Sequence, residues 1–104
     1  MFVIRRVVGD SMSPTLRPGQ TILGIRQPRV LSRWPGFLLR PGRIAIVLHD
    51  GLEKIKRIEK LEDNRLYVLG DNPVVSTDSR NFGWLTTEEV LAVVIWPLQI
   101  GRRG

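Results

Sequence analysis

The sequence predicts an all-β protein, built as a small rolled sheet or barrel with little helix. Short runs rich in valine, isoleucine and leucine recur along the chain, and turns containing glycine or proline separate most of them. Asp50–Gly51 lies between two such runs and is a typical hairpin turn. The 104 residues show no internal repeat or boundary, so a single domain over 1–104 is expected.

Six strands are expected, each a short run of β-branched or aliphatic residues. In chain order they cover 2–8, 20–25, 43–49, 52–61, 65–70 and 90–96. The run 52–61 mixes polar and apolar residues in a way that also fits a helix, but the hairpin turn before it favours a strand.

Turns and loops join these strands. Two prolines and a glycine predict a tight turn over 13–19, and three prolines make 26–42 an irregular loop. Segment 71–83 is expected to be a loop as well. Thr86–Thr87 offers a cap for one short helix before the last strand.

The composition excludes several kinds of chemistry. The chain has no cysteine, which removes disulfides, thiolate catalysis and most structural zinc sites. His49 is the only histidine, and the carboxylates do not show the spacing of metal ligands, so neither a metal nor a cofactor is expected. No apolar run approaches the ~20 residues of a membrane span and the start of the chain lacks a secretory signal pattern, so we expect a cytoplasmic protein. The alternative is a protein that associates peripherally with a membrane.

The net charge of +6, from 16 Lys+Arg against 10 Asp+Glu, attracts anionic partners. One hypothesis is therefore a basic β-barrel that binds nucleic acid without doing chemistry. Few aromatic residues accompany the arginines for base stacking, which makes this the weaker alternative.

Ser11 lies in the stretch GDSMSPTLRPGQ, where a rigid turn follows the hydroxyl. The stretch is compatible with a plain turn or with a nucleophile. A nucleophilic serine needs a base, and with one histidine in the chain lysine is the main candidate. Its pKa of ~10.4 would have to fall to about 7–8, which burial against apolar side chains can supply.

The base is therefore expected on a strand, on a face shared with hydrophobic residues. Strand alternation places Leu52, Lys54, Lys56 and Ile58 on one face, so both lysines qualify. The pattern alone does not choose between them, and both also fit ordinary solvated lysines of a strand.

Five blocks of the sequence, taken in order, resemble the type I signal peptidases, which are Ser–Lys peptidases. The blocks are GDSMSPTLRPGQ, IKRI, VLGDN, STDSRNFG and VIWP. The LexA-type repressor peptidases are more distant relatives. The resemblance covers nearly the whole chain and implies the rolled all-β fold of this group. It also implies that Ser11 is the nucleophile and that Lys56, directly followed by Arg57, is the general base in preference to Lys54.

The same resemblance implies roles for the residues around this pair. Met12 and Pro14 would shape the nucleophile turn and its hydrophobic surround. Ser76 would orient the lysine by a hydrogen bond. Other residues are implied to hold the site together: Asp78 and Arg80, which with Arg57 would brace the loop against the lysine strand, and the tight turn Gly70, Asp71 and Asn72.

Gly9 stands where many bacterial signal peptidases carry a hydroxyl that stabilises the oxyanion. The backbone N–H of Ser11 and a further donor would then form the oxyanion hole, or Gly9 lets the substrate backbone approach closely. Asp10 and His49 suggest a Ser–His–Asp arrangement, but neighbouring residues of a strand point to opposite faces, which argues against it.

Only ten residues precede Ser11, where signal peptidases normally carry a membrane anchor, and the second β-domain of some members is missing. With Trp96–Pro97, this resembles the small maturation proteases of nickel-type superoxide dismutase. The implied partner is a precursor with an N-terminal leader, cut by a monomer without nickel of its own. Processing of secreted preproteins and a non-catalytic regulatory module are the alternatives. The apolar stretch Ser32–Leu39 fits a loop over one end of the barrel better than a membrane contact or substrate groove.

Overall fold

The computed structural model describes residues 1–26, 38–74 and 77–97, and it is dominated by a single antiparallel sheet. The sheet has seven strands in the order β1-β2-β7-β3-β4-β5-β6. Their bounds, with the two short helices, are β1 Phe2–Arg6, β2 Thr21–Ile25, β3 Ile44–His49, β4 Leu52–Glu62, β5 Arg65–Leu69, α1 Ser79–Phe82, β6 Leu85–Thr86, η1 Thr87–Glu89 and β7 Val90–Trp96. The all-β fold with little helix is confirmed.

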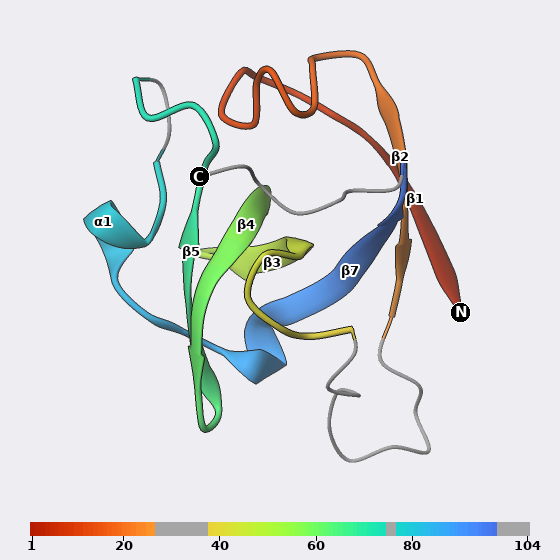
Figure 1. Cartoon of the computed structure of the whole chain (residues 1–104). Helices are drawn as coiled ribbons and strands as arrows, with labels where there is room; N and C mark the ends of the chain where they lie inside the picture. Colours follow the sequence, from red (N-terminus) through yellow and green to blue (C-terminus); the bar gives the residue numbers. More distant parts are fainter. Residues whose placement is uncertain (27–37, 75–76, 98–104) are drawn as a thin grey trace.

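The sheet is rolled rather than flat, as Figure 1 shows. β1 and β4 are separated by three strands in the sheet order, yet Arg5 of β1 donates hydrogen bonds to Glu53 of β4. Such a contact requires the sheet to curl back on itself. The turn after β1 consequently arches over the end of β4 and β5.

The central strand β3 is buried on both faces, which explains its unbroken apolar sequence IAIV. Ala45 and Val47 belong to one core cluster, together with buried residues of β4 to β7. Ile44 and Ile46 belong to a second cluster, which contains β1, β2 and the turn after β1. The two cores therefore lie on opposite sides of β3.

The hairpin at Asp50–Gly51 forms as predicted, and it fixes the register of β4 against β3. Ala45 lies opposite Lys56 and Val47 lies opposite Lys54. Both lysines therefore point to the face of the first core cluster, where Ile58 is also buried.

The loop predicted over 71–83 is wrong in one part, because it contains the helix α1. Asp78 caps this helix by accepting from the Arg80 backbone, and the Asn81 side chain accepts from the Asp78 backbone in return. This capping box offsets a composition that otherwise favours turns. The short helix expected at Thr86–Thr87 is confirmed as η1, with Thr86 as its N-cap.

Segment 26–42 is only partly described. Leu38 and Leu39 are buried in the first core cluster, as expected of a loop folded over one end of the barrel. The rest of the stretch Ser32–Leu39 lies outside the described residues.

Candidate active site

Ser11 lies in a tight turn rather than on a strand, because the Ser13 N–H donates to the Asp10 carbonyl at 3.0 Å. The Met12 side chain on the inner side of this turn is almost fully buried in the second core cluster. Leu16 continues the anchor, since its N–H donates to the Met12 carbonyl and its side chain packs in the same cluster. The turn therefore holds the half-buried Ser11 on a fixed backbone.

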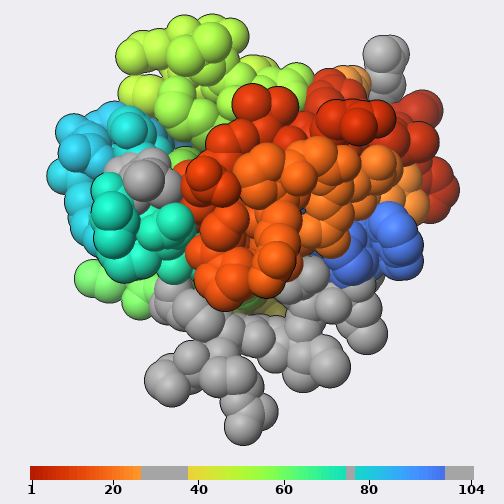
Figure 2. All heavy atoms as spheres, turned by 90° about the horizontal axis from the view of Figure 1, so that it is seen from above, coloured from red at the N-terminus to blue at the C-terminus, as the bar shows by residue number. Residues whose placement is uncertain are grey.

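A second tight turn, which follows β5, clamps the backbone around Ser11. The Asn72 N–H donates to the Ser11 carbonyl at 2.8 Å, and its side-chain amide donates to the Asp10 carbonyl at 3.2 Å. Figure 2 shows these two segments in contact, the turn that carries Ser11 in orange-red and the segment after β5 in teal. Asn72 thus fixes the backbone of Asp10 and Ser11 and, with it, the position of the Ser11 side chain.

Asp71 joins the turn that carries Ser11 to the strand that carries Lys56. Its carboxylate accepts two hydrogen bonds from Arg57, at 2.9 and 2.7 Å, and one from the Thr15 hydroxyl at 2.6 Å. The third Arg57 bond goes to the Gly42 carbonyl at 2.7 Å. The side chains of Arg57 and Asp71 are only 3% and 4% exposed, so this is a buried, fully engaged ion pair.

Lys56 precedes Arg57 on β4 and is 4% exposed. Burial is the main cause that lowers its pKa from the ordinary value of 10.5. The neighbouring charge of Asp78 raises the pKa, whereas the charges of Lys54 and Arg80 lower it. The net effect favours the neutral amine, which is the form that can accept a proton.

Lys54 lies in a different environment although it shares a strand face with Lys56. Its ammonium donates to the His49 carbonyl at 3.2 Å and lies 5.7 Å from the centre of the Phe82 ring. The structure therefore separates two lysines that the alternation of the strand left equivalent. Lys54 is engaged by the His49 carbonyl and the Phe82 ring, and Lys56 is the buried one.

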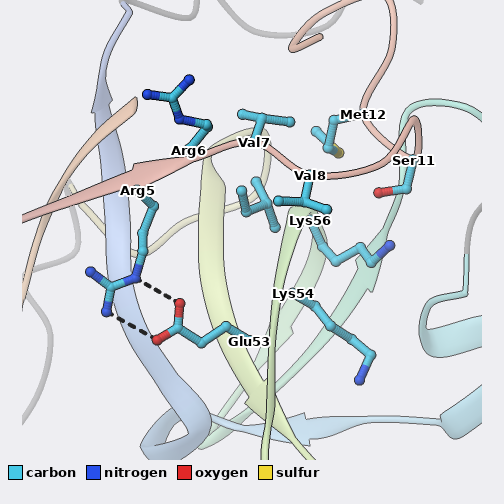
Figure 3. Close-up of a pocket in the computed structure, with 10 residues that line it drawn as sticks. Arg5, Arg6, Val7, Val8, Ser11, Met12, Glu53, Lys54 and Lys56 are labelled. Atoms are coloured by element: carbon cyan, nitrogen blue, oxygen red, sulfur yellow. Dashed lines mark hydrogen bonds and ion pairs between the residues drawn. The ribbon is translucent and has the colours of Figure 1, made fainter. Parts of the chain in front are cut away.

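Ser11 and Lys56 line the same pocket, which has a volume of about 310 Å³. In Figure 3 the Ser11 hydroxyl and the Lys56 amine point toward the same end of this pocket. The Lys54 amine points away from that end. The structure shows no direct hydrogen bond between the two, which is common for catalytic pairs before a substrate binds. The complete lining consists of Arg5, Arg6, Val7, Val8, Ser11, Met12, Glu53, Lys54, Ile55 and Lys56.

The predicted network of Asp78, Arg80 and Arg57 is wrong in one member. Asp78 does bind Arg80, with bonds of 3.0 and 2.7 Å, and it also accepts from the Gly70 N–H at 2.8 Å. The side-chain hydrogen bonds of Arg57 go to Asp71 and Gly42 instead. The loop is therefore braced against the turn after β5 by Asp78, and against the lysine strand by Asp71.

Two residues close to Ser11 in the chain differ from their expected setting. Pro14 is exposed, so it contributes to the turn but not to the apolar surround that Met12 supplies. Gly9 has a φ of +82°, a conformation that L side chains rarely adopt. An added Cβ would meet nothing within 4 Å, so backbone conformation rather than space favours glycine at this position.

The Ser–His–Asp arrangement is not formed. His49 stacks on Phe82 with ring centres 4.3 Å apart, and it does not line the pocket. The Asp10 carboxylate lies 3.4 Å from the Ser13 hydroxyl, which donates to it. Ser76, expected to orient the lysine, lies outside the described residues.

Sequence reasoning did not single out Thr15 and Ser79. The Ser79 hydroxyl accepts from the Val68 N–H at 2.8 Å and so fastens α1 to β5. Ser79 stands inside the block STDSRNFG, so its place beside Asp78 was a usable signal. Thr15 had no such signal, because its partner Asp71 is 56 residues away in the chain.

Comparison with known families shows what the chain is related to. A family model described as signal peptidase, peptidase S26, matches residues 43–99, more than half of the chain. The chain belongs to the signal peptidase family, peptidase S26. It is therefore a serine-type peptidase with signal-peptidase-like activity on protein substrates. The matched segment contains Lys56 but not Ser11. A search of the curated proteins found no match.

Neither a metal-binding cluster nor a membrane-spanning helix is found in the part of the chain that the structure describes. No group of three or more histidine, aspartate or glutamate side chains is arranged to hold a metal ion within 1–26, 38–74 and 77–97. No helix within these same described residues of the chain is long and apolar enough to cross a membrane.

Proposed function

We propose that this signal peptidase family member cuts peptide bonds with a Ser11–Lys56 dyad. Lys56 takes the hydroxyl proton while the Ser11 oxygen bonds to the scissile carbonyl carbon. The same amine returns the proton to the leaving nitrogen, which leaves an acyl-enzyme. Lys56 then takes a proton from water, the water oxygen attacks the ester, and Ser11 regains its hydrogen. The observation that carries this proposal is the shared pocket of a braced serine and a buried lysine with a lowered pKa.

The pocket suits an extended peptide. β1 pairs with β2 alone, and residues 52–56 of β4 pair only with β3, because pairing with β5 begins at Arg57. Among the described strands, both segments therefore present an unpaired edge beside the pocket. A substrate backbone can add to such an edge by main-chain hydrogen bonds, which accept many sequences.

The oxyanion of this reaction would be held by backbone rather than by a side chain. Gly9 supplies no hydroxyl, and no described residue accepts a hydrogen bond from the Ser11 N–H. We propose that this N–H stabilises the developing charge, together with one further donor.

The narrower proposal concerns the substrate. We propose that the protein is a cytoplasmic monomer that removes an N-terminal leader from a precursor, with nickel-type superoxide dismutase as the candidate. The blocks around Ser11 and Lys56, the segment STDSRNFG and Trp96–Pro97 support it, because they resemble the small maturation proteases of that enzyme.

Incubation with two purified precursors tests the substrate proposal. One is the leader-bearing dismutase precursor, and the other is a secreted preprotein with a typical signal sequence. We expect cleavage of the first at one bond, identified by sequencing the new amino terminus, and none when Ser11→Ala protein is used. Cleavage of the preprotein alone would replace this proposal by general signal peptide processing.

A further inference from the structure

The Arg5–Glu53 ion pair closes the pocket at the end away from Ser11 (Figure 3). The guanidinium of Arg5 donates two bonds to the Glu53 carboxylate, at 2.7 and 3.0 Å, from β1 to β4. The two residues are 48 positions apart, so the pair spans the cleft between the two unpaired strand edges. A peptide lying along those edges would meet it.

The position of this pair predicts which substrate residue it meets. Glu53 precedes Lys56 by three residues on the same strand, a distance of ~10 Å in an extended chain. An extended peptide has the same rise per residue. With the scissile carbonyl beside Ser11 and Lys56, its third or fourth residue from the cut bond would lie beside Arg5 and Glu53.

The pair can exchange partners because it is accessible. The side chains of Arg5 and Glu53 are 37% and 38% exposed, and ion pairs this exposed contribute little to stability. A carboxylate of the substrate can therefore take the place of Glu53 on Arg5 without disturbing the core. Hydrogen bonding to Arg5 lowers the pKa of Glu53, so its carboxylate is ionised at neutral pH.

The surrounding charges favour an acidic substrate residue over a basic one. Glu53 is the one carboxylate among the pocket residues, which also include the basic side chains of Arg6 and Lys54. Arg26 is near enough to lower the pKa of Glu53 further. A substrate lysine would have to compete with Arg5 for the Glu53 carboxylate among other positive charges. If it succeeded, the Arg5 guanidinium would lose its partner in that positive environment.

We propose that Arg5 and Glu53 determine specificity by selecting a substrate with an acidic side chain three or four residues from the cleaved bond. This inference rests on the proposed function only for the location of that bond. The charge preference comes from the Arg5–Glu53 pair, and peptide binding without cleavage is enough to measure it.

The test uses Ser11→Ala protein and fluorescent peptides of one cleavable sequence, with Glu, Gln or Lys placed at each position on both sides of the cut. We expect about fivefold tighter binding for Glu than for Lys at the third or fourth position on one side, the size of one surface ion pair. In the same background, Arg5→Gln should abolish or reverse the preference, and Glu53→Gln should increase it. Arg65→Gln, which removes a charge far from the pocket, is the matched control.

Equal binding of the Glu and Lys peptides would overturn the inference. So would a preference that persists in Arg5→Gln protein, one confined to the residues next to the cut, or no binding of any peptide. Tight, Glu-selective binding without cleavage by the wild-type protein would instead overturn the proposed function and leave the charge preference standing.

Discussion

Replacing Lys56 by methionine is expected to abolish peptide cleavage, with kcat/KM reduced by about 10³-fold or more. Methionine preserves the length and apolar character of the lysine stem but cannot accept a proton. Lys54→Met is the matched control and should retain most of the activity, because Lys54 binds the His49 carbonyl and Phe82 instead. Initial rates on one peptide for the three proteins decide between the two lysines. Equal loss in both variants would contradict the assignment of Lys56 as the base.

The Lys56→Met variant is also expected to be more stable than the wild type at pH 7. Burial lowers the Lys56 pKa below 10.5, so the unfolded chain binds more protons at this residue than the folded chain does. Stability of the wild type therefore rises as pH increases through the folded pKa toward 10.5. Urea unfolding across this range should show the advantage of Lys56→Met at pH 7 shrinking as the lysine becomes neutral in both states.

Asp71→Asn is expected to lower the free energy of unfolding by about 3 kcal/mol, the second large effect. The asparagine keeps the size of the side chain but leaves the buried Arg57 guanidinium without a counter-charge. Turnover should fall as well, because Asp71 also accepts a hydrogen bond from Thr15 in the turn that carries Ser11. Urea unfolding midpoints and kcat for the folded fraction measure the two effects.

The matched control for Asp71→Asn is Glu62→Gln. It breaks the Arg65–Glu62 pair, whose side chains are both 55% exposed, and should cost less than about 1 kcal/mol. If Asp71→Asn costs no more than this control, Asp71 does not stabilise the buried Arg57 in the way that the structure indicates.

Local sequence patterns predicted the strands well because each pattern reflects burial. IAIV is apolar throughout since β3 contacts both cores, and Asp50–Gly51 fixes the hairpin that aligns β3 with β4. The same pattern placed Lys56 on a face with Ile58. It failed at α1, because the capping box of Asp78 and Asn81 stabilises a helix that the composition alone does not favour.

The site was less predictable wherever the partner of a charged residue depends on how the sheet rolls. The resemblance paired Arg57 with Asp78, and no local pattern indicates which carboxylate the rolled sheet brings to Arg57. The fold gives it Asp71, and leaves Asp78 to Arg80 and Gly70. Arg5 and Glu53 meet only because β1 curls back to β4, which no local pattern encodes.

The central claim is that a neutral Lys56 amine activates Ser11, and a direct titration of Lys56 tests it. The chain has only three lysines, so ¹³Cε-labelled lysine gives a simple NMR spectrum in which the Lys56→Met variant assigns the signal. We expect Lys56 to titrate with a midpoint below 10.5, and kcat/KM for peptide cleavage to rise with pH through the same midpoint. A Lys56 midpoint at or above 10.5, or cleavage that rises through a different midpoint, would contradict the account.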